Sequence, residues 1–285
     1  MTSIEVAKCQ VLFERSDQFH ATGTGHLSIK TFLHGEARYA VGAARYRVND
    51  DCYLVLNHGQ AYTITIDAAK PVESFCIFFA PDLAAEVNRS LTATIAQLVD
   101  DPTHTCATPL HFFERTYRHG DTVSPVMQQL RRAFPLHRHE PNWLAEQAHY
   151  LMVQLLAAHH QVYAETASLS AVRPATREEL YRRLHVARDF IAASFAQPIT
   201  LDEIAHVAAL SPNHLLRSFK ALFHTTPHQY LTEERLAHAC RLLRTTELPI
   251  TTICLDVGFQ SLGSFSTRFR RRFGQSPVQF RQQAG

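Results

Sequence analysis

The C-terminal part of the sequence repeats itself, and this repeat limits the possible folds more than any other feature. Residues 200–230 align with residues 251–280, first at an offset of 49 and then at an offset of 50. The matched positions are Ile204, Ala205 and Leu210 with Ile253, Cys254 and Phe259, followed by Ser211, Leu215, Phe219, Phe223, Thr226, Pro227 and Tyr230 with Ser261, Phe265, Phe269, Phe273, Ser276, Pro277 and Phe280. A period of about 50 residues is typical of a duplicated supersecondary unit.

Each copy is predicted to form a helix, a tight turn and a second helix. In the first copy the second helix begins at Ser211 and Pro212, because serine is favoured at an N-cap and proline at the first helical position. Leu215, Phe219 and Leu222 then recur at helical spacing and predict a buried stripe. In a helix-turn-helix the second helix enters the major groove of DNA. A helical repeat with a merely solvated polar face is the alternative, which the duplication disfavours.

Positive charge gathers in the repeated part of the chain. Residues 176–285 carry 14 Lys and Arg against 9 Asp and Glu, a net of +5, and the remaining residues carry 14 against 17, a net of −3. Arginine predominates in the basic part, and its planar fork suits phosphate groups and guanine edges. The pattern therefore predicts contacts with DNA phosphates.

The repeat also resembles a known family. The segment VGFQSLGSFSTRFRRRFGQSPVQFR at residues 257–281 resembles the C-terminal signature of AraC/XylS-type transcription regulators, and LAHACRLLRTTELPITTI at residues 236–253 resembles the segment that leads into it. The resemblance covers roughly residues 180–283. It implies a ligand-responsive regulator, in most cases an activator, that binds double-stranded DNA, acts with RNA polymerase and forms a homodimer. It also implies a cupin-like N-terminal domain that holds a small-molecule effector.

Exposed residues early in each second helix are the predicted base contacts, because Asn suits an adenine edge and Arg a guanine edge. They are Asn213, His214 and Arg217 in the first unit and Gln260, Leu262, Ser264, Thr267 and Arg268 in the second. The predicted phosphate contacts are Ser211, Lys220, Ser261, Arg270, Arg271 and Arg272. Relatives often carry Arg where this sequence has Thr267, so the second unit is expected to bind mostly through phosphates.

The N-terminal half has a different pattern. Short β-rich runs with a period of two, separated by turn clusters, extend from His26 to Phe79 and predict a small barrel or jelly roll. Residues 1–25 are expected to be a mobile lead or a first edge strand, and further extended runs are expected around HFFERTY. Helices are expected near residues 83–99, 122–134 and 142–165. The last of these either covers the barrel or pairs with its twin in a dimer.

The predicted fold is therefore α+β with two domains: an N-terminal cupin-like barrel with accessory helices, and an all-α C-terminal domain with two helix-turn-helix units. The predicted limits are residues 1–165 for the first domain, 166–175 for a linker ended by Pro174, and 176–285 for the DNA-binding domain, whose first helix is expected to start at Thr176. The sequence contains no run of the roughly 18 apolar residues that a membrane helix needs. It also shows no apolar core of a secretory signal, so a cytoplasmic location is expected.

An effector pocket would be lined by inward-facing strand residues with a few polar groups. The candidates are Tyr39, Tyr46, Tyr62, Phe75 and Phe79, for each of which ordinary barrel core is the simpler interpretation. If one of Arg38, Arg45 and Arg47 pointed inward, it would favour an acidic effector.

No enzyme activity or cofactor is predicted from the sequence. A metal-dependent cupin needs His-x-His and Glu on adjacent strands, and the only such histidine pair, His137 and His139, lies in a stretch flanked by Pro135 and Pro141 that reads as a loop. The six cysteines are scattered without a CxxC pair, which argues against a structural zinc site and against the clustered cysteines of a DNA-alkylation repair protein. Two alternatives stay open: a metal-dependent cupin enzyme fused to a DNA-binding module, and a regulator controlled by a partner protein without a small ligand.

Overall fold

The computed structural model describes residues 3–6, 8–94, 110–167 and 174–284. The chain divides into two compact units, Met1–Arg182 and Arg183–Gly285. The domain limits expected from the sequence stay a prediction. Residues 168–173, which make up most of the expected linker, lie outside the described residues.

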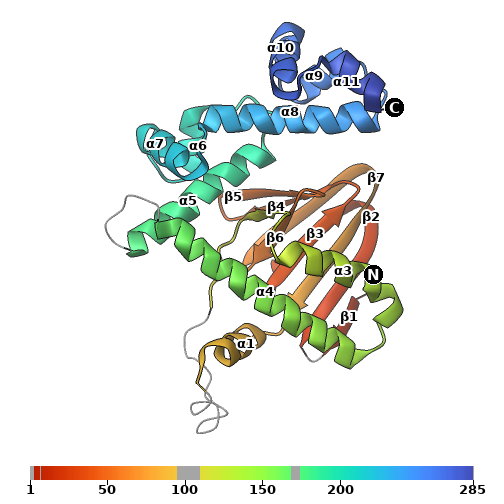
Figure 1. The fold of residues 1–285 in the computed structure, drawn as a ribbon, viewed down its shortest axis with the longest axis vertical. Helices are drawn as coiled ribbons and strands as arrows, with labels where there is room; N and C mark the ends of the chain where they lie inside the picture. The colour runs from red at the N-terminus through yellow and green to blue at the C-terminus, as the bar shows by residue number, and fades with distance from the viewer. Residues whose placement is uncertain (1–2, 7, 95–109, 168–173, 285) are drawn as a thin grey trace. The chain divides into compact units, whose positions relative to one another are not determined.

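Within the described residues of the first unit, eight antiparallel strands form one nearly closed barrel (Figure 1). They are β1 (Ser3–Val6), β2 (Cys9–Thr24), β3 (Ser28–Leu33), β4 (Glu36–Val41), β5 (Ala44–Asn49), β6 (Cys52–Leu56), β7 (Ala61–Phe79) and β8 (Thr116–Arg118). The order is β1-β2-β7-β3-β6-β8, and β4 pairs with both β5 and β7. The predicted barrel is confirmed. Of the pair of extended runs expected around HFFERTY, β8 is one, and residues 110–115 form no strand.

The bend of β7 defines the interior of the barrel. Tyr62 and Phe78 stand near opposite ends of this strand, sixteen residues apart. The Nζ atom of Lys30 on β3 nevertheless lies 5.4 Å from the ring centroid of Tyr62 and 3.5 Å from that of Phe78. A straight strand would separate the two rings by roughly 50 Å. β7 therefore curls around the interior, and a register shift between Ser16 and Gln18 of its partner β2 accompanies the bend.

The strands β1 and β2 settle the two alternatives expected for residues 1–25 in favour of edge strands. β1 ends the strand order, and β2 pairs with β7 along most of its 16 residues but with β1 only at Cys9–Leu12, so its remaining residues pair on one side only. Much of its second half is exposed. An exposed strand needs no apolar residues at alternate positions, which is why the sequence pattern did not distinguish this strand from a mobile lead.

The helices of the first compact unit are α1 (Leu83–Thr92), α3 (Val123–His137), α4 (Pro141–Ala167) and the first part of α5 (Pro174–Ala193). Of these, α3 and α4 pack on the outer face of the sheet, and α1 packs on α4. Phe134 of α3 packs against Phe13 and Phe75, with ring centroids 6.0 and 5.9 Å apart respectively. The thiol of Cys9 donates to the carbonyl of Leu144 on α4 at 3.9 Å. These contacts bury the face of the sheet that points away from the barrel interior.

Three helix limits differ from the sequence expectations. Pro135 lies inside α3, near its end, and does not mark a loop. Proline lacks a backbone N–H, and near the end of a helix this removes one hydrogen bond without breaking a long run of them. α5 starts at Pro174, two residues before the expected Thr176. α1 ends at Thr92, and the rest of the expected helix, residues 95–99, lies outside the described part of the chain.

The second unit is helical throughout its described elements. After the second part of α5 come α6 (Leu201–Val207), α7 (Pro212–Phe223), α8 (Pro227–Thr245), α9 (Ile250–Asp256), α10 (Leu262–Phe273) and α11 (Pro277–Ala284). The sequence predicts a helix over roughly residues 227–245 that connects the two helix-turn-helix units, and α8 has these limits. It carries α6 and α7 at one end, and α9, α10 and α11 lie along its other half (Figure 1). Across the residues described in both units, no helix has the length and apolar character needed to cross a membrane.

Candidate nucleic-acid interface and barrel interior

In the first helix-turn-helix unit the second helix, α7, has an exposed polar face and a buried aromatic and aliphatic face. Ser211 is its N-cap and accepts a hydrogen bond from the backbone N–H of His214 at 3.4 Å. Leu215 and Phe219 are buried. The predicted contact residues Asn213, His214, Arg217 and Lys220 are all exposed on this helix. The structure thus gathers the first unit's predicted set on one accessible helix.

The matching helix of the second helix-turn-helix unit, α10, is built in the same way. Ser261 caps it by accepting from the N–H of Ser264 at 3.3 Å, and Phe265 and Phe269 are buried. The remaining residues predicted to contact DNA here are also exposed: Gln260, Leu262, Thr267, Arg268, Arg270, Arg271 and Arg272. Four of them are arginines on one helix, whereas α7 carries only Arg217 and Lys220 as full cations. The two helices therefore share a core and differ in charge.

The turn inside each unit requires a left-handed backbone. Ala209 in the first unit has φ 51°, and the equivalent Gly258 in the second has φ 88°. A Cβ atom at Gly258 would lie 2.8 Å from the backbone oxygen of Ala196, so only glycine fits there. Arg235 of α8 donates to the carbonyls of Phe195 at 2.7 Å and Gln197 at 2.9 Å beside this turn. The turn of the second helix-turn-helix unit thus lies closely against the residues that follow α5.

A basic hollow of about 440 Å³ lies between α8 and α10. Arg268, Arg271 and Arg272 line it from α10, and Glu233 lines it from α8. The carboxylate of Glu233 accepts from Nε of Arg272 at 2.6 Å. One acid therefore faces three guanidinium groups, which leaves the hollow with an excess of positive charge. Arg268, predicted to read a base, shares this hollow with two of the arginines predicted to bind phosphate.

Three of the predicted pocket aromatics lie on the face of the sheet that forms the barrel interior. Tyr39 pairs in register with Tyr46 across β4 and β5, so both side chains point to the same side. The ring of Tyr39 also lies 5.6 Å from that of Tyr62, centroid to centroid. Tyr62 in turn lies beside Lys30. Tyr39, Tyr46 and Tyr62 are therefore interior residues.

Phe75 and Phe79 lie on the opposite face of β7, and the prediction that they line an interior pocket is wrong. Neighbouring residues of a strand alternate between faces, and Phe78 is the residue that points inward to Lys30. Phe75 instead packs on Phe134 of α3. The two faces of the sheet therefore divide the five candidates into an interior group and an outer group.

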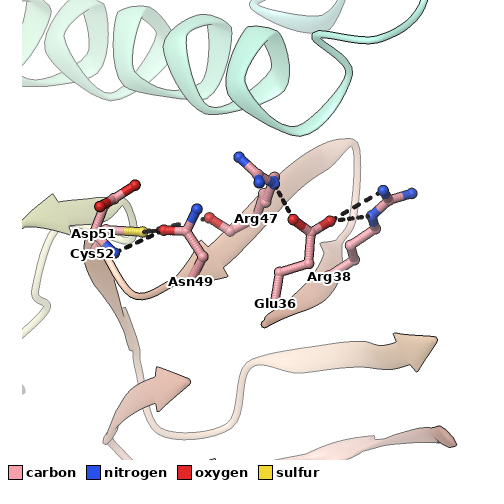
Figure 2. Close-up of polar contacts among 6 residues, drawn as sticks. All are labelled: Glu36, Arg38, Arg47, Asn49, Asp51 and Cys52. Atoms are coloured by element: carbon pink, nitrogen blue, oxygen red, sulfur yellow. Dashed lines mark hydrogen bonds and ion pairs between the residues drawn. The ribbon is translucent and has the colours of Figure 1, made fainter. Parts of the chain in front are cut away.

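The three arginines considered for an acidic effector do not point into the interior. In the register of β4 and β5, Arg38 pairs with Arg47 on the face opposite Tyr39. Figure 2 shows Glu36 between the two guanidinium groups, with ion pairs to both. Burial alone would raise the pKa of the Glu36 carboxyl, but Arg47 and Arg38 outweigh it and lower this pKa. Arg45 donates to the carbonyls of its own turn at 2.8 and 2.9 Å.

Lys30 is the interior group that the sequence reading missed. Only 2% of the surface of Lys30 is exposed, and burial lowers the pKa of its amine to about 8. Nearly every residue of β3 is buried, on both faces of the strand. Alternation therefore gave no sign of the direction in which this lysine points. A lysine in the middle of the apolar run SIKTFL was the available signal.

The histidine pair considered for a metal has other contacts. His137 is the last residue of α3, stacks on Trp143 and lies 3.1 Å from a carboxylate oxygen of Glu140. His139 accepts from Nε of Arg138 at 3.1 Å. Among the residues with described positions, no group of three or more His, Cys, Asp or Glu side chains is arranged to hold a metal ion.

Two capped recognition helices on one connecting helix, with a positive hollow beside the second, define a DNA-binding protein with a double helix-turn-helix. The family model described as a helix-turn-helix domain matches residues 204–283. The regulatory protein SoxS of Salmonella typhimurium is 37% identical over 93 residues, which are 33% of this chain and 87% of SoxS. The HTH-type transcriptional regulator AlkR of Acinetobacter baylyi is 38% identical over 88 residues, which are 31% of this chain and 29% of AlkR.

The chain belongs to the AraC/XylS family of DNA-binding transcription regulators. A solved regulator with an AraC-type DNA-binding domain from Chromobacterium violaceum is 34% identical, covers 36% of this chain and 92% of its own, and has a TM-score of 0.35. The matched segment spans most of SoxS but under a third of AlkR.

Proposed function

We propose that this protein is an effector-responsive transcription activator in which the first helix-turn-helix selects the DNA sequence and the second mainly holds the phosphate backbone. The observation that carries the proposal is the difference in side chains between α7 and α10, whose buried positions match. A polar, hydrogen-bonding face reads base edges, whereas a row of arginines neutralises phosphates.

The face of α7 supports base reading. Asn213 and Arg217 are exposed and lie near the start of the helix, which is the part that reaches base edges in a helix-turn-helix. Their amide and guanidinium groups match adenine and guanine edges respectively. His214 adds a third hydrogen-bonding side chain on the same helix. The hydroxyl oxygen of Ser211 accepts the hydrogen bond that caps α7. Its role is therefore to orient α7 next to the phosphate backbone of DNA.

The face of α10 supports phosphate binding. Where α7 has Ser218, Lys220, Ala221 and Leu222, α10 has Arg268, Arg270, Arg271 and Arg272. At the positions equivalent to Asn213, His214 and Arg217, α10 has Gly263, Ser264 and Thr267. Electrostatic contacts of this kind raise affinity for any DNA sequence. α10 therefore contributes affinity more than selectivity.

The other parts of the proposal follow from the family. Activation with RNA polymerase, a homodimer, a cytoplasmic location and a small effector held in the barrel are proposed for this chain on that basis. Three interior tyrosines, Tyr39, Tyr46 and Tyr62, supply aromatic surface suited to a small organic ligand. A connecting helix of the length of α8 would set the two units on one face of DNA, roughly 34 Å apart.

The decisive experiment is selection of DNA sites from a random pool by the purified chain, followed by affinity measurements on the selected site and on scrambled DNA. We expect two adjacent half-sites about one helical turn apart. The half-site with the higher information content should be the one protected by α7, which crosslinking from a cysteine placed at Asn213 would identify. Equal information in both half-sites would contradict the division of roles, and equal affinity for selected and scrambled DNA would contradict the function itself.

A further inference from the structure

The barrel interior contains one buried cation. Lys30 lies in the middle of β3, and its residue is 2% exposed. Its Nζ atom is within 5.4 Å of the ring centroids of Tyr62 and Phe78, which belong to the two ends of the curled strand β7. The amine is therefore enclosed by the barrel and not directed to its surface.

No acid in the described part of the chain forms an ion pair with Lys30. Glu36, Glu73 and Asp189, which are the acids of the buried ion pairs, have arginine partners. Glu14 of β2 has an interior-facing register opposite Ser74 but is only partly buried. A buried ammonium without an anion costs several kcal/mol. Lys30 is thus an unusual core residue unless an anion joins it.

A second polar group on the same face also lacks a partner. Ser28 precedes Lys30 by two residues, so the two side chains point to the same side of β3. Its residue is fully buried, and within the described residues its hydroxyl has no hydrogen-bond partner. Buried hydroxyls are nearly always hydrogen-bonded in proteins. An unpaired donor beside an unpaired cation indicates a shared acceptor.

The surroundings are aromatic. Phe32 follows on the same face of β3, and its ring centroid lies 6.1 Å from that of Tyr39, which in turn contacts Tyr62. Phe78 covers the amine itself. A ligand that fits these groups carries one negative charge at one end and apolar surface elsewhere, because a single cation balances a single anion and rings contact apolar atoms.

We propose that the barrel interior binds a small monocarboxylate with an apolar body, whose carboxylate accepts from Lys30 and Ser28 and whose body packs among Phe32, Tyr39, Tyr62 and Phe78. This inference rests on the proposed function in one respect, since it identifies the chemical class of the effector. It replaces the arginines of β4 and β5, which do not point into the interior, with Lys30 as the group that selects an acid.

The test uses the purified full-length chain without DNA and two matched pairs of probes: octanoate with octanol, and 4-phenylbutyrate with 4-phenylbutanol. Thermal unfolding and titration calorimetry are measured for the wild type, Lys30→Met, Lys30→Arg and the control Lys70→Met. Lys70 is an exposed lysine on β7, so its replacement removes the same charge outside the interior.

We expect at least one acid to raise the unfolding temperature of the wild type and of the control Lys70→Met, which keeps Lys30. The matching alcohol should raise this temperature far less. Lys30→Met should weaken acid binding about 10- to 100-fold, the usual loss for one charge-assisted hydrogen bond. Lys30→Arg should keep part of the affinity. Ser28→Ala, which leaves the charge in place, should cost less.

Three results would overturn the inference: equal stabilisation by acids and alcohols, unchanged acid binding by Lys30→Met, or no binding of either acid at ~1 mM. Circular dichroism and retained DNA affinity show whether Lys30→Met is folded. If it is not, Lys30→Arg and Ser28→Ala decide the question. A wild-type chain that binds an acid but does not bind DNA would contradict the proposed function and not the carboxylate site. The two failures are therefore distinguishable.

Discussion

The two helix-turn-helix units have matching cores and different surfaces. Buried Leu215 and Phe219 of α7 correspond to Phe265 and Phe269 of α10, and both helices start with a serine cap. The exposed positions diverge, from mostly neutral hydrogen-bonding groups in α7 to arginines in α10. The comparison shows that packing holds the geometry of the motif while the surface is free to specialise.

The units also differ in how they are stabilised. α6 begins with a capping box between Thr200 and Glu203, whereas α9 begins after Pro249 without a side-chain cap. The second unit depends instead on contacts with other helices, such as Arg281 donating to the carbonyl of Leu248 at 2.7 Å and Arg235 beside Gly258. The second unit is therefore expected to be more sensitive to changes at its turn.

The largest predicted effect tests this sensitivity. Gly258→Ala should destabilise the chain by about 3 kcal/mol, because the new Cβ would lie 2.8 Å from a backbone oxygen at a φ of +88°. Ala209→Gly, at the equivalent turn of the first unit, should stabilise by up to about 1 kcal/mol, since it relieves a left-handed alanine. Urea unfolding monitored by circular dichroism measures both.

Gly274→Ala is the matched control for Gly258→Ala. Gly274 also has a positive φ of +76°, but nothing lies within 4 Å of a Cβ built there. Only the backbone strain of about 1 kcal/mol should appear. Equal losses for the two alanine variants would show that close packing at the second turn is unimportant and would remove this difference between the units.

The duplicated core was predictable from the sequence because each buried position recurs at a fixed offset. The α8 limits followed from the same repeat, with proline at one end and a break in the apolar pattern at the other. The barrel was predictable as a class but not in detail. Lys30 was missed and Phe75 was assigned to the wrong face because β3 and the last part of β7 are buried on both faces, so a period of two does not show which face is interior.

The faces of the recognition helices could be predicted, but their neighbours could not. Helical spacing placed Arg217, Arg268 and Arg271 on exposed positions. It could not show that Arg268 and Arg271 share a hollow with Glu233, because that residue comes from α8 and no local pattern links the two helices. Contacts between elements far apart in the chain need the three-dimensional structure.

The second prediction concerns sequence selection. Arg217→Ala should lower the affinity for the selected site by ~1–3 kcal/mol and relax the preference at one base pair, because a guanine edge loses its partner. Thr267→Ala, at the equivalent position of α10, should change the preference little. Binding to a set of single-base variants of the site measures both. A larger change of preference for Thr267→Ala would reverse the assigned roles.

The third prediction concerns the arginine row. Arg271→Ala should weaken binding to the selected site and to scrambled DNA by the same factor, about 1 kcal/mol at moderate salt, and should reduce the slope of log affinity against log salt by about 1. Fluorescence anisotropy across a salt series provides both values. A loss confined to the selected site would mean that Arg271 reads a base.

The smallest predicted effect comes from Glu233, which pairs with Arg272 at 2.6 Å across the basic hollow. Both side chains are about half exposed, so the pair itself contributes little to stability. Glu233→Gln should free Arg272 for phosphate and raise affinity for all DNA by roughly two- to fivefold, equivalent to at most ~1 kcal/mol. Glu247→Gln removes the same charge from an exposed position in the same unit. If both variants gained equally, net charge alone would explain the effect, and the hollow would have no special part in holding DNA.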